Sequence, residues 1–400
     1  MGLSIGFDYS DSGRILGPLL VFLAGYLILG YILTSYLKKR VDITFDNGIL
    51  IVKTKKFNII IKRVGTKWVK ALKVFSTISI PVTLVLMSIG VYLLHDNLYK
   101  LLYKQSEASP FIPIIPGVTL GIESLPYFII GVFIVLVSHE LAHGVVAASE
   151  KIPIVSSGFF MAFVFFGGFV EPDEDEFSKS SLLSKFRVLS VGSTSNYLIA
   201  LIVSVLFSAL FTPTPGIVVE ETLKGYPAHD SLKPYDIIVS MNGVPIESPE
   251  DLSEFMKRTK PGDSVEVTVI RGDEKVRITL TLAPDPRNSS KGFLGIRLSQ
   301  RYSTKIPLPL SLQANTIFSH YVQRLVLWIT MLSSSIAVIN ALPLYPFDGG
   351  QMLVWLLRSK LKNKSLVKNV STIVSVYFAA LLIANVVLTF KLPSVRLWLP

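Results

Sequence analysis

The sequence contains no cysteine and little charge, and both shortages exclude classes of protein. Without cysteine, the chain has no disulfides, no thiolate metal ligands and no cysteine nucleophile. Charged residues make up 17% of the 400 residues, while 50% are hydrophobic. Soluble domains carry about 25% charged residues, so this composition indicates a membrane protein. Histidine is also scarce, with five residues, and any close pair of histidines is therefore informative.

Apolar runs that are long enough to cross a bilayer occur six times along the chain. A transmembrane helix needs about 20 consecutive, mostly apolar residues. The runs cover residues 15–36, 74–94, 127–148, 188–211, 325–344 and 370–390. The first run is too long for a cleaved signal peptide, and acidic residues precede it where such a peptide is basic. The sequence therefore predicts a mainly α-helical polytopic membrane protein with about six transmembrane helices.

Most of the net positive charge lies in residues 38–73, between the first two runs. This segment holds eleven Lys and Arg against two Asp, or +9 of the net +11. Because Lys and Arg are enriched in cytoplasmic loops, we interpret this charge as setting topology and not as binding nucleic acid. Residues 150–186 and 356–369 then also face the cytoplasm. A hairpin signal, Asp-Asn-Gly at 46–48, and the mostly apolar residues 57–61 predict a small cytoplasmic β-sheet.

A second soluble segment, residues 213–300, falls on the opposite, extracytoplasmic side of the predicted membrane. Ser248 followed by Pro249 is typical of a helix N-cap and first helical position. Two alternating strands follow, over 265–270 and 276–282. This order of elements resembles a circularly permuted PDZ domain of the bacterial kind, which is an inserted α+β module.

The PDZ resemblance implies a binding loop just before the last strand of the module. The matching stretch is Phe293-Leu294-Gly295-Ile296. In PDZ domains such a loop holds a peptide carboxylate through backbone N–H groups, and the peptide adds to the sheet as a strand. The alternative is a structural cap or a size filter that has no peptide ligand.

The motif that carries chemistry is His139-Glu140-Leu141-Ala142-His143, in the third apolar run. Residues four apart share one face of a helix, so the two imidazoles can bind one Zn²⁺ while Glu140 serves as general base. The alternative is that the two histidines are buried for structural reasons alone, with a charged glutamate between them. These side chains would then need hydrogen-bond or charge partners, which hydrocarbon does not offer. Ionisable residues inside a membrane span mark functional sites. The motif therefore predicts a catalytic zinc site within the bilayer.

A catalytic zinc ion needs a third protein ligand and an open coordination position. Residues 144–149 lack the Gly and His of the metzincin pattern, so the third ligand must come from elsewhere. Glu171 and Asp348 are the candidates near membrane depth, and Asp348 is favoured. Pro343 and Pro346 end the fifth helix just before it. The two glycines that follow Asp348 would let the backbone approach a metal closely.

Together these motifs resemble the site-2 protease family of intramembrane zinc metalloproteases, in its eukaryotic and archaeal branch. The resemblance rests on the H-E-x-x-H, on N-x-x-P from Asn340, on Asp-Gly at 348–349 and on G-x-x-x-N from Gly192 to Asn196. Phe347 stands where the family usually has Leu before its Asp-Gly, which is a conservative departure.

The family resemblance implies roles for particular residues. The zinc ligands would be His139, His143 and Asp348, and the catalytic base would be Glu140. Asn196 and Asn340 are candidates for holding the substrate or the oxyanion. For Asn196, a hydrogen bond between helices is the alternative.

The predicted domains follow from the spans and the motifs. A first transmembrane helix (1–37) and the basic β segment (38–73) precede a protease core in two parts, 74–212 and 316–400. The PDZ-like domain, 213–300, lies between these parts. Residues 155–170 resemble a membrane-associated β-hairpin that pairs with an unwound substrate.

The predicted function is hydrolysis of peptide bonds within or near transmembrane segments of membrane-anchored proteins. The partners would be the lipid bilayer and transmembrane substrates that another protease has already cut outside. The expected location is a prokaryotic, archaeal cell membrane. A non-proteolytic transporter or a PDZ-bearing adaptor is the alternative. A transporter would spread ionisable residues over several spans, whereas here they converge on one cluster.

Overall fold

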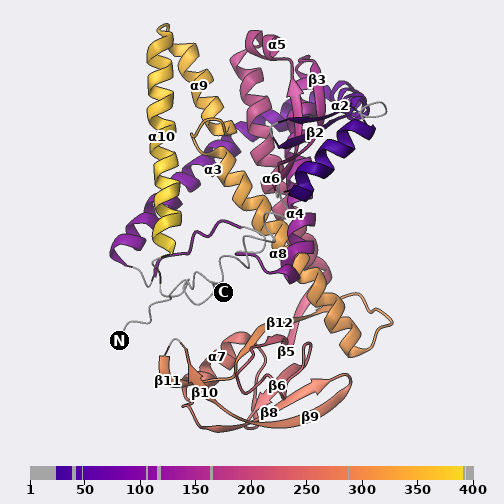
Figure 1. The fold of residues 1–400 in the computed structure, drawn as a ribbon, viewed down its shortest axis with the longest axis vertical. Coiled ribbons are helices and arrows are strands. Elements are labelled where there is room, and N and C mark those ends of the chain that lie inside the picture. The colour runs from indigo at the N-terminus through magenta and orange to yellow at the C-terminus, as the bar shows by residue number, and fades with distance from the viewer. Residues whose placement is uncertain are drawn as a thin grey trace. The chain divides into compact units, whose positions relative to one another are not determined.

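The computed structural model describes residues 24–37, 42–46, 48–104, 107–114, 119–162, 165–286, 288–390 and 392. Five helices in this part of the chain are long and apolar enough to cross a membrane (Figure 1). They are α3 (Val69–Tyr103), α4 (Leu125–Ser149), α6 (Leu182–Leu210), α8 (Leu312–Ala341) and α10 (Lys364–Thr389). Between 17% and 33% of the most apolar window of each helix is buried. Their remaining apolar side chains face outward, as they do in a membrane span.

The first predicted span is described only in its second half. A shorter apolar helix covers Ala24–Leu37, and residues 15–23 lie outside the described residues. The other five predicted spans each coincide with one of the five long helices, although three of them extend one to three residues past its C-terminal end. The helical membrane architecture is thus confirmed for five spans, and the sixth stays a prediction.

A four-stranded antiparallel sheet joins two segments that the sequence places on one side of the membrane. β1 (Asp42–Asp46) and β2 (Ile49–Lys53) form the predicted hairpin, while β3 (Ile154–Ala162) and β4 (Phe165–Pro172) form a second one. The hairpins pair through β2 and β3, where Leu50 lies opposite Met161. The strand order β1-β2-β3-β4 leaves β4 at an edge of the sheet.

The strand predicted at residues 57–61 is wrong, because these residues belong to helix α2 (Lys55–Lys67). Ile61 is fully buried, and a Cβ at Gly65 would lie 2.6 Å from the Cβ of Ala148 on α4. Residues four apart share a helix face, so Ile61 and Gly65 both face α4. This packing outweighs the strand propensity of three successive isoleucines.

The fifth span ends where its prolines predict, and a short helix brings the chain back to the bundle. α8 stops at Ala341, and α9 (Asp348–Lys360) begins with Asp348. A Cβ at Gly349 would lie 1.9 Å from the Ala341 carbonyl oxygen, and one at Gly350 would lie 2.4 Å from the Tyr345 nitrogen. The glycines therefore allow close approach to the backbone at the end of α8 and just after it, while their approach to a metal stays a prediction.

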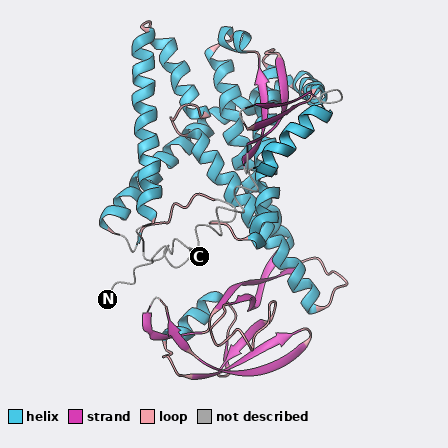
Figure 2. Cartoon of the chain, in the orientation of Figure 1, coloured by secondary structure: helices cyan, strands magenta, loops and turns pink. Residues whose placement is uncertain are grey.

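Residues 201–330 form a separate compact unit that is rich in strands (Figure 2). Its sheet has the order β12-β5-β6-β8-β9, with β7 paired to β6. The strands are β5 (Phe211–Thr222), β6 (Ile237–Met241), β7 (Val244–Pro245), β8 (Ser264–Arg271), β9 (Glu274–Thr281) and β12 (Ile296–Thr304). A two-stranded ribbon pairs β10 (Ala283–Asp285) with β11 (Asn288–Phe293).

The short helix of this unit, α7 (Pro249–Lys257), starts at the predicted N-cap. The Ser248 hydroxyl accepts a hydrogen bond from the Asp251 N–H, and the Asp251 carboxylate accepts one from the Ser248 N–H. This reciprocal capping box satisfies two backbone donors that the helix end would otherwise leave unpaired. The predicted strands at 265–270 and 276–282 correspond to β8 and β9. The α+β character of this segment is therefore as predicted.

Candidate metal centre

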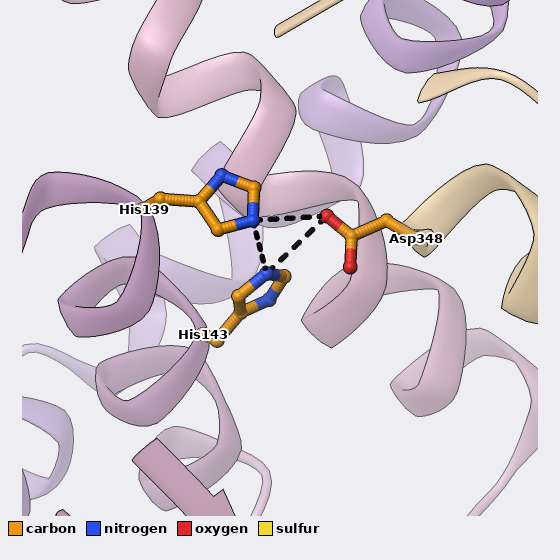
Figure 3. Close-up of side chains that lie close together, drawn as sticks. All are labelled: His139, His143 and Asp348. Atoms are coloured by element: carbon orange, nitrogen blue, oxygen red, sulfur yellow. Dashed lines mark hydrogen bonds and ion pairs between the residues drawn. The ribbon is translucent and has the colours of Figure 1, made fainter. Parts of the chain in front are cut away.

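Two imidazoles on α4 and one carboxylate on α9 meet at a single point in the helical unit (Figure 3). The Nε2 atoms of His139 and His143 lie 3.1 Å apart, and each lies 3.3 Å from the Asp348 Oδ2. The three side chains are only 8%, 12% and 10% exposed, respectively. The H-E-x-x-H spacing places both rings on one helix face, and the α8–α9 turn brings in the carboxylate.

The spacing of these three atoms fits a zinc ion. A tetrahedral zinc ion with ligands at about 2.0–2.1 Å separates the ligand atoms by about 3.3 Å. The observed separations of 3.1 and 3.3 Å match this value. Among the described residues, the buried Asp348 Oδ2 accepts no hydrogen bond. A buried carboxylate oxygen that has two imidazoles beside it but no hydrogen bond is costly, and a cation at this point would satisfy it.

The outer nitrogens of both imidazoles have partners that orient the rings. His143 Nδ1 lies 2.6 Å from the Val188 carbonyl oxygen. A carbonyl only accepts, so Nδ1 carries the hydrogen and the Nε2 lone pair faces the cluster. His139 Nδ1 lies 3.2 Å from the Asn196 Nδ2, and the Asn196 Oδ1 accepts a hydrogen bond from the Ser138 hydroxyl. The G-x-x-x-N motif thus supports one imidazole from behind.

Gly192 makes room for both rings, a role that the sequence motif did not reveal. A Cβ at this position would lie 2.4 Å from His143 Nε2 and 2.8 Å from His139 Nε2. Gly192 and Asn196 lie four residues apart on α6, so the same helix face carries the space for the rings and the hydrogen bond to His139. The chain therefore builds its cluster from α4, α6 and α9.

The cluster opens into a cavity of about 600 Å³ that Glu140 and Asn340 also line. The Glu140 Oε2 accepts a hydrogen bond of 3.1 Å from the Val170 N–H on β4. Glu171 lines the same cavity, but its carboxylate accepts a hydrogen bond from the Ser156 hydroxyl. Asp348, and not Glu171, is therefore the carboxylate that the structure brings to the two histidines.

The predicted peptide-binding loop lies in the strand-rich unit, between β11 and β12. Its Gly295 has a φ of +79°, a left-handed conformation that favours glycine. The carbonyl oxygens of Leu294 and Gly295 accept hydrogen bonds from the N–H groups of Ala228 and Leu223. The loop from Phe293 to Ile296 is thus tied to its own unit, and its role in binding a peptide stays a prediction.

The apolar helices and the buried His-His-Asp cluster define an integral membrane protein that carries the donor set of a metallohydrolase. The chain belongs to peptidase family M50, which matches residues 127–384. This match confirms the family resemblance inferred from the sequence. The protein is therefore a membrane metalloprotease.

The chain is also similar to individual proteins and solved structures. The chain is 30% identical over 302 residues to an uncharacterized protein of Methanocaldococcus jannaschii. The matched residues make up 73% of this chain and 75% of that protein. It is 26% identical over 212 residues to a membrane-bound transcription factor site-2 protease homolog of Arabidopsis thaliana, or 51% of this chain and 41% of that protein. Among solved structures, the PDZ domain of an SdrC-like protein from Listeria monocytogenes covers 21% of this chain and 87% of that one, with 27% identity and a TM-score of 0.20.

Proposed function

We propose that this protein is an intramembrane zinc endopeptidase that hydrolyses peptide bonds within or near transmembrane segments of anchored substrates. The observation that carries the proposal is one cavity that holds three zinc-spaced donor atoms and a separate glutamate. His139, His143 and Asp348 would hold the ion. When bound, zinc supplies Lewis-acid chemistry that polarises a carbonyl and makes water nucleophilic near neutral pH.

Glu140 is placed to move the proton. It follows His139 on α4, yet its carboxylate turns to the Val170 N–H, which holds one oxygen at 3.1 Å. The other oxygen can take a proton from the attacking water and then pass it to the leaving amine, as a general base and acid does.

The edge of β4 offers a place for the substrate backbone. The Val170 N–H donates its hydrogen bond to Glu140. It therefore points away from β3, the strand that pairs with β4. Groups two residues apart on a strand point the same way, so the Gly168 N–H also faces this edge. A Cβ at Gly168 would lie 3.7 Å from the Glu140 Cγ. A substrate strand added here would expose its peptide bond beside Glu140, whereas a helix would shield it.

Asn196 and Asn340 take different positions in this proposal. Asn196 is fully buried and bonded to Ser138 and His139, which supports a role in holding the His139 ring. With the Nε2 of His139 turned to the ion, its Nδ1 carries a hydrogen. The Asn196 Nδ2 faces this atom in the structure, so the amide would turn by about 180° to present its Oδ1 as the acceptor. Asn340 lines the open cavity and is the better candidate for contacting the substrate.

We place residues 213–300 outside an archaeal cell membrane, on the side opposite the basic segment 38–73. The topology follows from the concentration of Lys and Arg in that segment. Substrates would be single-span proteins already trimmed outside. The PDZ-like domain would either bind their new carboxyl ends through the loop at 293–296 or exclude bulky ectodomains.

Cleavage of a single-span model substrate by the purified full chain tests this function. We expect cleavage with bound zinc, loss of cleavage with a chelator and recovery when zinc is returned. Glu140→Gln should keep zinc but lose at least about 100-fold in rate. Glu174→Gln, with the same charge change at the edge of the same cavity, is the matched control. Cleavage by Glu140→Gln at the control rate would disprove the mechanism, and a zinc-loaded chain without cleavage would favour the transporter or adaptor.

A further inference from the structure

A cavity of about 970 Å³ between α9 and α10 is lined by four cations and lies apart from the metal centre. The cations are Arg358, Lys362, Lys364 and Lys368. In the described part of the chain, no Asp or Glu lines this cavity, and none pairs with these cations. It shares no described lining residue with the cavity of the metal centre. Uncompensated positive charge around a cavity of this size indicates an anionic ligand.

Two lining residues of this cavity, Trp355 and Arg358, belong to an aromatic and cationic stack. The Arg358 Cζ lies 4.8 Å from the centre of the Trp355 ring, and the Lys185 Nζ lies 4.4 Å from it. The Phe177 ring packs edge-on against the same indole, with centroids 5.9 Å apart. Stacking on an indole orients a guanidinium while its N–H groups stay free. Arg358 is thus held ready to donate to an anion.

The cavity also contains an unsatisfied hydroxyl. The Ser371 Oγ on α10 is buried and has no hydrogen-bond partner among the described residues. A buried hydroxyl without a partner is costly. An anion with several oxygens, such as a phosphate group, would give Ser371 an acceptor and would also meet the cations.

Apolar surface continues from the cavity along α10. Ile373 and Val376 are 68% and 62% exposed, and Val376 also lines the cavity. In a membrane-spanning helix such side chains contact acyl chains. The predicted topology places residues 356–369 at the cytoplasmic surface, where basic pockets between helices hold the head groups of anionic lipids. A ligand with both a phosphate and acyl chains fits this surface better than free phosphate.

We propose that this α9–α10 cavity binds the phosphate head group of an anionic membrane lipid. Arg358 and the three lysines would contact the phosphate, Ser371 would donate to it, and the acyl chains would lie along Ile373 and Val376. The site is independent of the metal centre and of peptide hydrolysis.

Lipid binding to the purified full chain in neutral detergent tests this site. The probes are short-chain phosphatidylglycerol and a phosphatidylcholine with the same chains. We expect phosphatidylglycerol to bind more tightly, and Lys362→Gln with Lys368→Gln to weaken it by at least about tenfold. The matched control is Lys62→Gln with Lys70→Gln, which removes the same charge from exposed positions in the basic segment. The thermal unfolding midpoint and zinc content of each variant show whether it is folded.

A neutral substitution separates a built site from general surface charge. Ser371→Ala should weaken phosphatidylglycerol binding about fivefold, because it removes a hydrogen bond to a charged group without changing the charge. Equal losses in both lysine pairs, with Ser371→Ala unchanged, would overturn the proposal. Equal binding of the two lipids would also overturn the proposal. If millimolar inorganic phosphate then competes with the lipids for binding, the site would be assigned to a free anion.

Discussion

Replacing Gly192 by alanine is the sharpest test of how the metal centre is built. The added methyl carbon would lie 2.4 Å from His143 Nε2 and 2.8 Å from His139 Nε2, the two atoms that face the ion. Non-bonded carbon contacts settle at about 3.5–4.0 Å. The rings would therefore have to retreat by roughly 1 Å, while zinc ligation tolerates displacements of about 0.2 Å.

The expected loss of zinc affinity follows from this displacement. Changes to outer partners of zinc ligands cost about 10–100-fold in affinity. Displacing two ligand atoms directly should lower the zinc affinity at least about 100-fold. The helix itself should not suffer, because alanine is more favourable than glycine in a helix interior by about 1 kcal/mol. A loss of zinc by Gly192→Ala would thus report on the rings and not on the stability of α6.

The assay is competition for zinc between the purified chain and a chromogenic chelator, with circular dichroism as the check on folding. Gly25→Ala is the matched control, because among the described residues no neighbouring side chain or element lies within 4 Å of its added carbon. We expect the control to bind zinc like the unmodified chain. Zinc affinity of Gly192→Ala within about threefold of the control would refute the arrangement of rings around Gly192.

Three further predictions concern the metal centre and the strand-rich unit. Asp348→Ala should lower zinc affinity at least about 100-fold by removing a ligand, and unchanged metal content by mass spectrometry would reassign the third ligand. Asn196→Ala should lower zinc affinity about 10–100-fold, whereas full zinc with slower turnover would instead point to a substrate contact. Arg271→Ala should lower the free energy of unfolding by about 3 kcal/mol, because the 1% exposed Asp236 carboxylate loses both guanidinium hydrogen bonds. Arg297→Ala, from an exposed pair, should cost under about 1 kcal/mol in the same denaturant titration.

Local patterns in the sequence determined much of this protein. Five apolar runs predicted five long helices, because a span has to satisfy its own backbone within lipid. The four-residue spacing of His139 and His143 placed their rings on one face, because helix geometry is local. Ser248 predicted the start of α7, because its hydroxyl reaches a backbone donor three residues away.

Tertiary structure decided the features that depend on which surfaces meet. Packing of Ile61 on α4 made residues 55–67 a helix, although residues 57–61 favoured a strand. The end of α8 brought Asp348 to two histidines that lie far away along the chain, and Gly192 came to lie against both imidazoles. No local rule contains these contacts, because each one arises when a residue of one element fills space beside another. The sequence therefore determined the parts of the metal centre, and only the packing of α4, α6 and α9 determined their geometry.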